Sequence, residues 1–299
     1  MHSETAHSGW RKLQLTLEMI KFEHSIFALP FALTGAMLAV SDAHLALSSV
    51  LGKLFWIIAA MVGARSAAMA FNRLLDAEID SRNPRTKMRH IPAGLLSTRF
   101  AWGFLVAMCA LLVFAAAMLN PLCLWLSPVA LAVVLFYSYT KRFTATSHLV
   151  LGFALGIAPA AAWIAIRGSL DPRIGWLTLA VMLWTAGFDV IYSCQDYDFD
   201  RQHGLFSLPA RLGVSKALLL SRLFHIGMLA CLVALAWSFS LGWLSAVGIL
   251  CVALLLAYEH SLVSPTDLSR VNAAFFTVNG YVSLLFFCLW AADLLWRKT

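Results

Sequence analysis

Long apolar runs separated by short polar segments extend along nearly the whole chain. A helix needs about 20 consecutive apolar residues to cross the hydrocarbon core of a bilayer. The pattern predicts nine such helices, at residues 25–41, 50–75, 100–118, 122–139, 148–166, 174–194, 214–238, 241–259 and 271–294. We therefore expect an all-α integral membrane protein, with a single transmembrane domain over residues 1–299 that begins with a polar segment at 1–23.

The composition supports this interpretation. Hydrophobic residues make up 61% of the chain and charged residues 12%, whereas soluble domains average about 45–50% and about 25%. A soluble fold of this length could not bury so much apolar surface. The polar N-terminal segment is not followed by a pattern typical of a cleavage site, so we expect the first apolar run to be a retained span.

The chain has a net charge of +7, and its basic residues lie mainly outside the predicted spans. Most Lys and Arg residues lie before the first predicted span or in the loops after the second, fourth and sixth. Cytoplasmic loops are enriched in these residues. We therefore expect the N-terminus and these three loops on the cytoplasmic face of the cell (inner) membrane, with Arg297 and Lys298 as a mild exception at the other face. The same pattern argues against nucleic-acid binding.

Two acidic clusters follow the second and the sixth predicted spans. The first reads Asn72-x-x-x-Asp76-x-x-x-Asp80, and the second reads Asp196-x-x-x-Asp200. Residues four apart on a helix lie one turn above each other, so each cluster points in one direction. The repeated placement suggests two related halves of four helices, plus one extra helix.

Carboxylates that meet at one membrane face repel each other, so we expect a cation between them. Mg²⁺ prefers oxygen ligands and completes its shell with water and substrate phosphates. The predicted magnesium ligands are Asn72, Asp76, Asp80, Asp196 and Asp200. Side chains suited to binding a diphosphate follow the two clusters. They are Arg85, Lys87, Arg89 and Arg201.

Arg65 and Asp189 are charged residues that lie within apolar helix rather than in a loop. Arg65 precedes Asn72 by seven residues, and Asp189 precedes Asp196 by seven, with Tyr192 on the same stripe. An ionised side chain at such a position costs about 2.5–3.5 kcal/mol on the insertion scale and usually faces a partner or a wet cavity. We expect these residues in the site, with Asp189 as a base or cation stabiliser.

Further candidates lie at the ends of the first and fourth spans. Those of the fourth span are Tyr137, Tyr139, Lys141 and Arg142. They fit an interfacial aromatic belt with anchoring cations as well as a cavity wall where a cation rests against aromatic rings. Lys21 and His24 before the first span are open to the same two interpretations, with lipid headgroup contact favoured.

The two clusters resemble the signatures of the UbiA superfamily of intramembrane prenyltransferases. Asn72-Arg-Leu-Leu-Asp76-Ala-Glu-Ile-Asp80 is similar to the first signature, and Asp189-x-x-Tyr192-x-x-x-Asp196-x-x-x-Asp200 is similar to the second. The likeness covers essentially the whole chain. It implies a UbiA-type helical bundle around a central cavity open to the cytoplasm and laterally to lipid, where magnesium bridges a diphosphate to both Asp motifs.

Within this family the chain looks most like the 4-hydroxybenzoate polyprenyltransferases and the branch assigned to menaquinone synthesis. The implied reaction moves a polyprenyl group from polyprenyl diphosphate to an aromatic acid, 4-hydroxybenzoate or a dihydroxynaphthoate, in ubiquinone or menaquinone biosynthesis. Arg65, Lys141 or Arg142 would hold the acceptor's carboxylate. Two departures are Arg73, where the family often has Asp, and Phe206, where ubiquinone enzymes often have Lys.

Two alternatives stay open at this point. The same fold can serve another acceptor, such as a haem or chlorin precursor or a glycerol phosphate. A membrane transporter also carries intramembrane Asp and Arg residues. It would place them near the midplane, whereas most acidic residues here follow helix ends beside diphosphate-suited cations.

Overall fold

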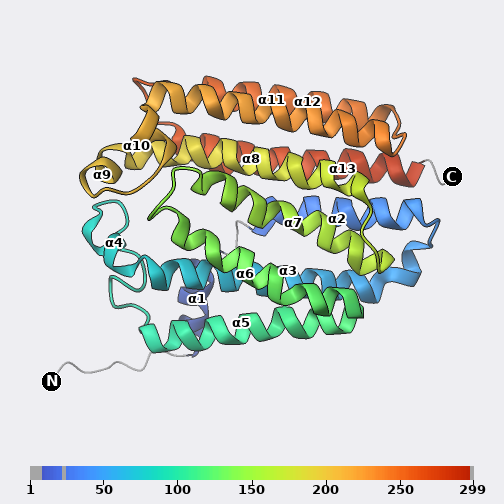
Figure 1. Cartoon of the computed structure of the whole chain (residues 1–299), viewed down its shortest axis with the longest axis horizontal. Coiled ribbons are helices and arrows are strands. Elements are labelled where there is room, and N and C mark those ends of the chain that lie inside the picture. Colours follow the sequence, from blue (N-terminus) through green and yellow to red (C-terminus); the bar gives the residue numbers. More distant parts are fainter. Residues whose placement is uncertain (1–8, 22–24, 297–299) are drawn as a thin grey trace.

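The computed structural model describes residues 9–21 and 25–296. Within these residues its regular elements are helices (Figure 1), apart from one isolated bridge between Ser264 and Asp267. The long helices are α2 (Ser25–Asp42), α3 (Leu51–Leu75), α5 (Thr98–Leu119), α6 (Pro121–Thr140), α7 (Ser147–Arg167), α8 (Gly175–Ser193), α11 (Val214–Ser238), α12 (Trp243–Ser261) and α13 (Asn279–Trp296). The short ones are α1 (Gly9–Met19), α4 (Ala77–Arg82), α9 (Tyr197–Gln202) and α10 (Leu208–Leu212), and a π-helix (Ala273–Val278) leads into α13.

Eight helical segments in the described part of the chain are long and apolar enough to cross a membrane. The apolar part of α2, Phe27–Asp42, is shorter and provides the ninth apolar helix. The expected all-α architecture is therefore confirmed, with nine as an approximate number of spans. The protein is a multi-pass membrane protein.

Helix boundaries follow residues that satisfy free backbone groups. The Ser97 side chain accepts a hydrogen bond from a backbone N–H in the first turn of α5, and the Asn120 side chain does the same for Cys123 at the start of α6. Pro121 then occupies the first position of α6, where no N–H is required. At the C-terminal end of α7, Gly168 adopts the left-handed conformation, with φ of 71°.

Helices α7 and α8 approach closely because small residues line their contact. A Cβ atom added at Gly152 would lie 2.2 Å from the carbonyl oxygen of Met182, and one at Gly156 would lie 2.6 Å from that of Thr178. Close backbone approach at small residues is a main way for membrane helices to pack. It brings the start of α7 next to the end of α8, where the second acidic motif begins.

The π-helix is held by one buried side chain. The Asn279 Nδ2 atom donates hydrogen bonds to the carbonyl oxygens of Ala274 and Phe275 at 3.1 and 3.2 Å, and to Glu259 Oε1 at 2.9 Å. Its Oδ1 atom accepts from Trp184 Nε1 at 2.6 Å. Polar groups within the membrane must be satisfied internally, so this amide fixes the backbone just before α13.

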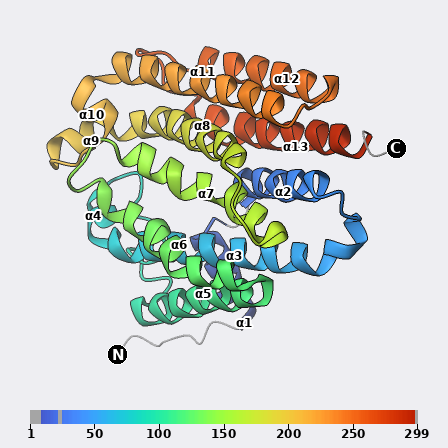
Figure 2. The same cartoon turned by 45° about the vertical axis from the view of Figure 1, so that its right-hand side comes forward.

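Both acidic motifs lie at the same end of the bundle. Helices α4, α9 and α10 gather at the left of Figure 1, whereas α13 ends at the right. Figure 2 shows the same grouping after rotation. The two acidic motifs, which we expected at one membrane face, therefore lie at one end of the helical bundle.

Candidate active site

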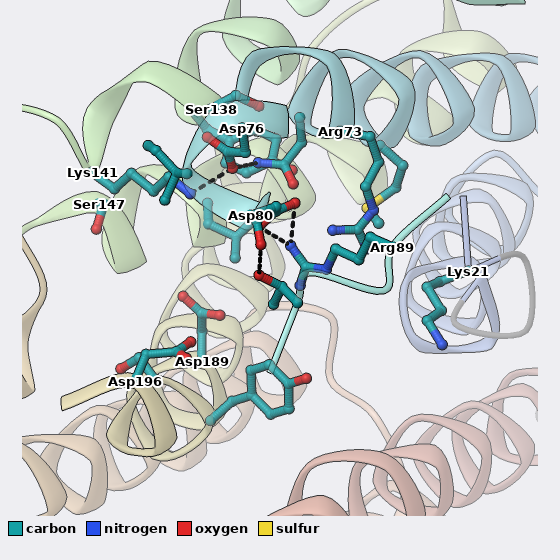
Figure 3. Close-up of a pocket in the computed structure, with 18 of the residues that line it drawn as sticks. Lys21, Arg73, Asp76, Asp80, Arg89, Ser138, Lys141, Ser147, Asp189 and Asp196 are labelled. Carbon is teal, nitrogen blue, oxygen red and sulfur yellow. Dashed lines mark hydrogen bonds and ion pairs between the residues drawn. The ribbon is translucent and has the colours of Figure 1, made fainter. Parts of the chain in front are cut away.

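A cavity of about 660 Å³ lies at this end of the bundle. Side chains from both motifs line it, and Figure 3 shows Asp76 and Asp80 on one side with Asp189 and Asp196 on the other. The remaining motif members that line it are Asn72, Tyr192 and Asp200. Motifs far apart in the sequence therefore share one compartment.

Asp76 occupies the junction of α3 and α4 and has an exposed fraction of 1%. Its Oδ2 atom accepts hydrogen bonds from Asn72 Nδ2 at 2.9 Å and from the Lys141 ammonium, and its Oδ1 atom accepts from Arg142 Nη2 at 3.2 Å. The Arg142 guanidinium also binds the carbonyl of Leu75 at 2.9 Å. The two cations that follow α6 thus offset the charge of Asp76.

Asp80 lies within α4 and is also buried. Arg89 Nη1 donates to both of its carboxylate oxygens, at 2.7 and 2.8 Å. Thr86 donates through Oγ1 to the Asp80 carbonyl at 3.1 Å, which fixes the loop that carries Arg89. This arrangement folds the basic segment after the first motif back over its own carboxylate.

Asp196, from the second motif, is bound by residues of the first motif's loop. Arg85 Nε donates to Oδ1 at 2.9 Å and its Nη2 donates to Oδ2, while Asn83 Nδ2 donates to Oδ1 at 3.1 Å. The Arg85 Nη1 atom donates to the Tyr192 hydroxyl at 3.2 Å, and the guanidinium lies 5.3 Å from the Tyr192 ring centroid. Burial alone would lower the pKa of Arg85, but its hydrogen bonds and charge interaction with Asp196 raise that pKa above its usual value.

Asp189 has a partner that the sequence analysis missed. His148, in the first turn of α7, contacts Asp189 Oδ2 through Nδ1 at 2.7 Å. Its other ring nitrogen, Nε2, accepts a hydrogen bond from the backbone N–H of Leu208 at 3.3 Å. The signal in the sequence was a single imidazole at the start of an apolar run, since a buried polar group requires partners.

A second part of the cavity wall is apolar and aromatic. It is formed by Phe27, Leu151, Leu155, Phe188, Phe275 and Phe276. The rings of Tyr192 and Phe275 lie 4.3 Å apart between centroids, and Phe276 lies 5.9 Å from Tyr192. The π-helix therefore presents two aromatic side chains beside the charged part of the cavity.

The other predicted site residues are divided between the cavity and the surface. Lys21, Arg65 and Tyr137 line the cavity. Tyr139 is exposed and packs against Phe71, because a residue two positions from Tyr137 lies on nearly the opposite side of a helix. Of the two positions that the sequence left open for Tyr139, the structure has the exposed one and not the cavity wall.

Two predicted diphosphate-binding residues also lie apart from the cavity wall. Lys87 is exposed on the loop after α4. Arg201 is exposed on α9, where its guanidinium binds the Tyr197 hydroxyl at 2.8 Å. Sequence proximity to the motifs did not reveal which way these loop side chains turn. His24 lies outside the described residues.

The charge repulsion expected between carboxylates is offset here by cations of the protein itself. In the part of the chain that the structure describes, no three His, Cys, Asp or Glu side chains form a ready-made metal cluster. The oxygen donors nonetheless share one cavity, and this donor chemistry fits Mg²⁺. A metal ion at Asp76, Asp80 and Asp196 would compete with Lys141, Arg89 and Arg85 for the same oxygens.

Arg73, the departure from the usual first motif, is buried. Its Nε atom donates to the Met19 carbonyl at 3.3 Å. It therefore holds the end of α1 beside the cavity, where Glu18 and Met19 also contribute to the wall.

Comparison with known proteins agrees with this geometry. The model of the UbiA prenyltransferase family matches residues 28–291. The chain belongs to this family. Proteins named 4-hydroxybenzoate octaprenyltransferase from Salmonella paratyphi B and Salmonella newport are each 30% identical to it over 236 residues, which cover 78% of this chain and 81% of theirs. It is accordingly a prenyltransferase, and the transporter alternative is set aside.

Solved structures show the same fold. The apo structure of a UbiA homologue from Aeropyrum pernix is 36% identical, with a TM-score of 0.81 over 89% of this chain and 96% of that one. A UbiA homologue from Archaeoglobus fulgidus, bound to GPP and Mg²⁺, is 20% identical, with a TM-score of 0.72 over 94% and 99%. The predicted UbiA-type bundle is confirmed.

Proposed function

We propose that this prenyltransferase transfers a polyprenyl group from polyprenyl diphosphate to the ring of a hydroxylated aromatic acid, 4-hydroxybenzoate or a dihydroxynaphthoate, for ubiquinone or menaquinone biosynthesis. The observation that carries the proposal is one cavity that joins both Asp motifs, basic side chains such as Arg85, Arg89 and Lys141, and an apolar aromatic wall. The names of the Salmonella relatives support an aromatic acid acceptor. The GPP and Mg²⁺ in the Archaeoglobus structure support a prenyl diphosphate donor and a divalent metal.

The charged part of the cavity suits the diphosphate. Asn72, Asp76, Asp80, Asp196 and Asp200 would hold magnesium, which supplies positive charge that stabilises the departing diphosphate. In this structure Arg85 and Arg89 donate hydrogen bonds to carboxylates. Phosphate oxygens can accept the same kind of hydrogen bond, so both arginines suit the diphosphate. Their charges are fixed in place before the reaction, which favours the transition state over the ground state.

The apolar part suits the prenyl chain and the allylic cation. The allylic C–O bond breaks and the diphosphate keeps the electron pair. The ring of Tyr192, packed against Phe275, offers an electron-rich face to the cationic carbon. The ring carbon ortho to the acceptor's hydroxyl then supplies the pair for the new C–C bond.

Asp189 is the proposed base for the last step. The C–H bond at the alkylated carbon breaks, its electrons restore the aromatic ring, and the proton passes to the Asp189 carboxylate. Arg65 and Lys141, which line the cavity, and Arg142, which contacts Asp76, are the proposed partners for the acceptor's carboxylate. We also propose that the end carrying both motifs faces the cytoplasm, following the distribution of Lys and Arg.

The acceptor is tested directly in membranes from cells that express the chain. An isotope-labelled polyprenyl diphosphate is paired with a panel of acceptors, and the lipid products are analysed by mass spectrometry. We expect a magnesium-dependent, ring-prenylated product from 4-hydroxybenzoate or a dihydroxynaphthoate. Membranes containing Asp196→Ala provide the control. A product formed only from a porphyrin, a chlorin or glycerol phosphate would refute the proposed acceptor class.

A further inference from the structure

The imidazole of His148 makes two hydrogen bonds, one with Asp189 and one with the backbone of Leu208. His148 belongs to α7 and has an exposed fraction of 4%, while Asp189 belongs to α8 and has a side chain 24% exposed toward the cavity. The third member, Leu208, is the first residue of α10. An imidazole so deeply buried must satisfy both ring nitrogens, and these two partners do so.

The partner at Nε2 determines where the imidazole carries its proton. The Leu208 backbone N–H can only donate, so Nε2 must accept and carries no hydrogen. In a neutral imidazole the proton then lies on Nδ1, which donates to Asp189 Oδ2 at 2.7 Å. A second proton on Nε2 would point at the Leu208 N–H and would cost this hydrogen bond.

This fixed tautomer gives the two oxygens of Asp189 different surroundings. Oδ2 is occupied by the imidazole, whereas among the described residues no hydrogen bond involves Oδ1. Figure 3 shows the Asp189 side chain pointing from α8 into the space beside Asp80. The carboxylate is thus held in one orientation, with an acceptor oxygen directed toward the cavity.

We propose that His148 is a positioning residue, which holds Asp189 as an oriented hydrogen-bond acceptor for the aromatic substrate and does not itself carry the proton. The inference rests on the proposed function, because it assigns Asp189 to the acceptor's ring proton or hydroxyl. Proton transfer to His148 would require Nε2 to give up the Leu208 N–H. The proton released by the ring therefore stays on Asp189 until water or the departing diphosphate removes it.

The segment that contains Leu208 also contacts the second Asp motif. Ser207, the residue before it, caps α10 by accepting from the Ala210 N–H at 3.3 Å, and Leu205 in the same segment donates its backbone N–H to the Asp200 carbonyl at 2.9 Å. The segment that holds His148 is therefore attached to the second Asp motif. The Leu205 contact and the Ser207 cap do not involve His148, so a change at His148 should leave the proposed magnesium ligand Asp200 in place.

Two substitutions separate positioning from proton transfer. His148→Gln keeps one donor and one acceptor in a carboxamide that does not take up a proton near neutral pH. His148→Leu keeps the bulk but removes both hydrogen bonds. Both variants are purified as full chains in detergent, and kcat and KM are measured with geranyl diphosphate and with the aromatic acid that the wild type uses.

We expect His148→Leu to lose about a hundredfold in turnover with the acceptor, the loss typical of a catalytic group displaced by about 1 Å. The KM for geranyl diphosphate and its magnesium-dependent breakdown without acceptor should stay unchanged. His148→Gln should recover to within about fivefold of wild type. In a double-mutant cycle, adding His148→Leu to Asp189→Asn should cause little further loss, because His148 acts only through Asp189.

Three results would overturn the inference. They are wild-type turnover in His148→Leu, a His148→Gln variant that is folded but as inactive as His148→Leu, and additive losses in the cycle. If His148→Leu does not fold, His148→Asn serves instead, because its shorter amide cannot span both partners. A wild type that prenylates no aromatic acid would instead refute the proposed function, which separates the two failures.

Discussion

Arg85 and Asp196 form a two-point ion pair although 111 residues separate them in the sequence. The pair joins the loop of the first motif to the second motif, and Asn83 strengthens it with a third hydrogen bond at 3.1 Å. It also places the guanidinium against Tyr192. The two halves of the site are therefore connected mainly through Arg85, with Asn83 as a second contact, which makes Arg85 an informative residue to change.

Replacing Arg85 should weaken binding of the donor. Arg85→Ala removes a guanidinium that donates several hydrogen bonds, and hydrogen bonds to charged groups contribute about 1.5–3 kcal/mol each. We expect the KM for geranyl diphosphate to rise by about tenfold to a hundredfold. Arg85→Lys should recover only part of this, because an ammonium cannot make the planar two-point contact. Equal KM values in both variants and the wild type would contradict the assignment.

The charge of Arg85 should not contribute to pH dependence near neutrality. Asp196 raises the pKa of Arg85 above its already high usual value. A raised folded-state pKa gives stabilisation that is complete below the unfolded-state value and is lost only as pH rises through the folded-state value. Between about pH 6 and 9, donor KM should change with pH alike in wild type and Arg85→Lys, as lysine also stays charged. Donor KM measured across this range tests the point.

Asp76 and Asp196 should be required for magnesium-dependent ionisation of the donor. Asp76→Asn or Asp196→Asn removes a charged oxygen ligand while keeping size, and we expect turnover to fall about a hundredfold or more, since metal stabilisation contributes several kcal/mol. Asp198→Asn is the matched control, because Asp198 is exposed on α9 and lies outside the cavity wall. Turnover near wild type in Asp76→Asn at saturating magnesium would exclude this residue as a ligand.

The contact between α7 and α8 should not tolerate a larger residue. In Gly152→Ala the new methyl group would meet the Met182 carbonyl oxygen at 2.2 Å, so the helices must separate. We expect a clear loss of folded, monodisperse protein and a lower melting temperature in detergent. Gly103→Ala in α5 is the control, because nothing lies within 4 Å of its added Cβ. Similar melting temperatures for both variants would show that α7 and α8 accommodate the change.

Asn279 should determine both stability and the shape of the apolar cavity wall. Asn279→Leu leaves π-helix carbonyls and Glu259 without this donor, and an unsatisfied buried polar group costs about 1–3 kcal/mol. We expect a lower melting temperature and an altered preference for prenyl chain length, because Phe275 and Phe276 belong to the same π-helix. Thr277→Val, at an exposed position of this π-helix, should leave both properties unchanged.

The sequence by itself determined the helices and the faces of the motifs. Apolar runs near the thickness of a bilayer must become helices, because only helices satisfy their backbone within a short segment. Four-residue spacing then directs Asn72 and Asp76 to one side. These local rules were sufficient for the fold class and for the residues that form the acidic part of the cavity, whereas the family was indicated by the resemblance of the two motifs to known signatures.

The tertiary structure decided which partners those residues meet. Spacing within one helix does not determine which other helix it faces, so it did not predict that His148 binds Asp189 or that Lys141 binds Asp76. It also did not exclude Tyr139, whose outward direction depends on how α6 is rotated within the bundle. Charge balance at the site depends on contacts between distant segments, and the packing of the helices brings those segments together.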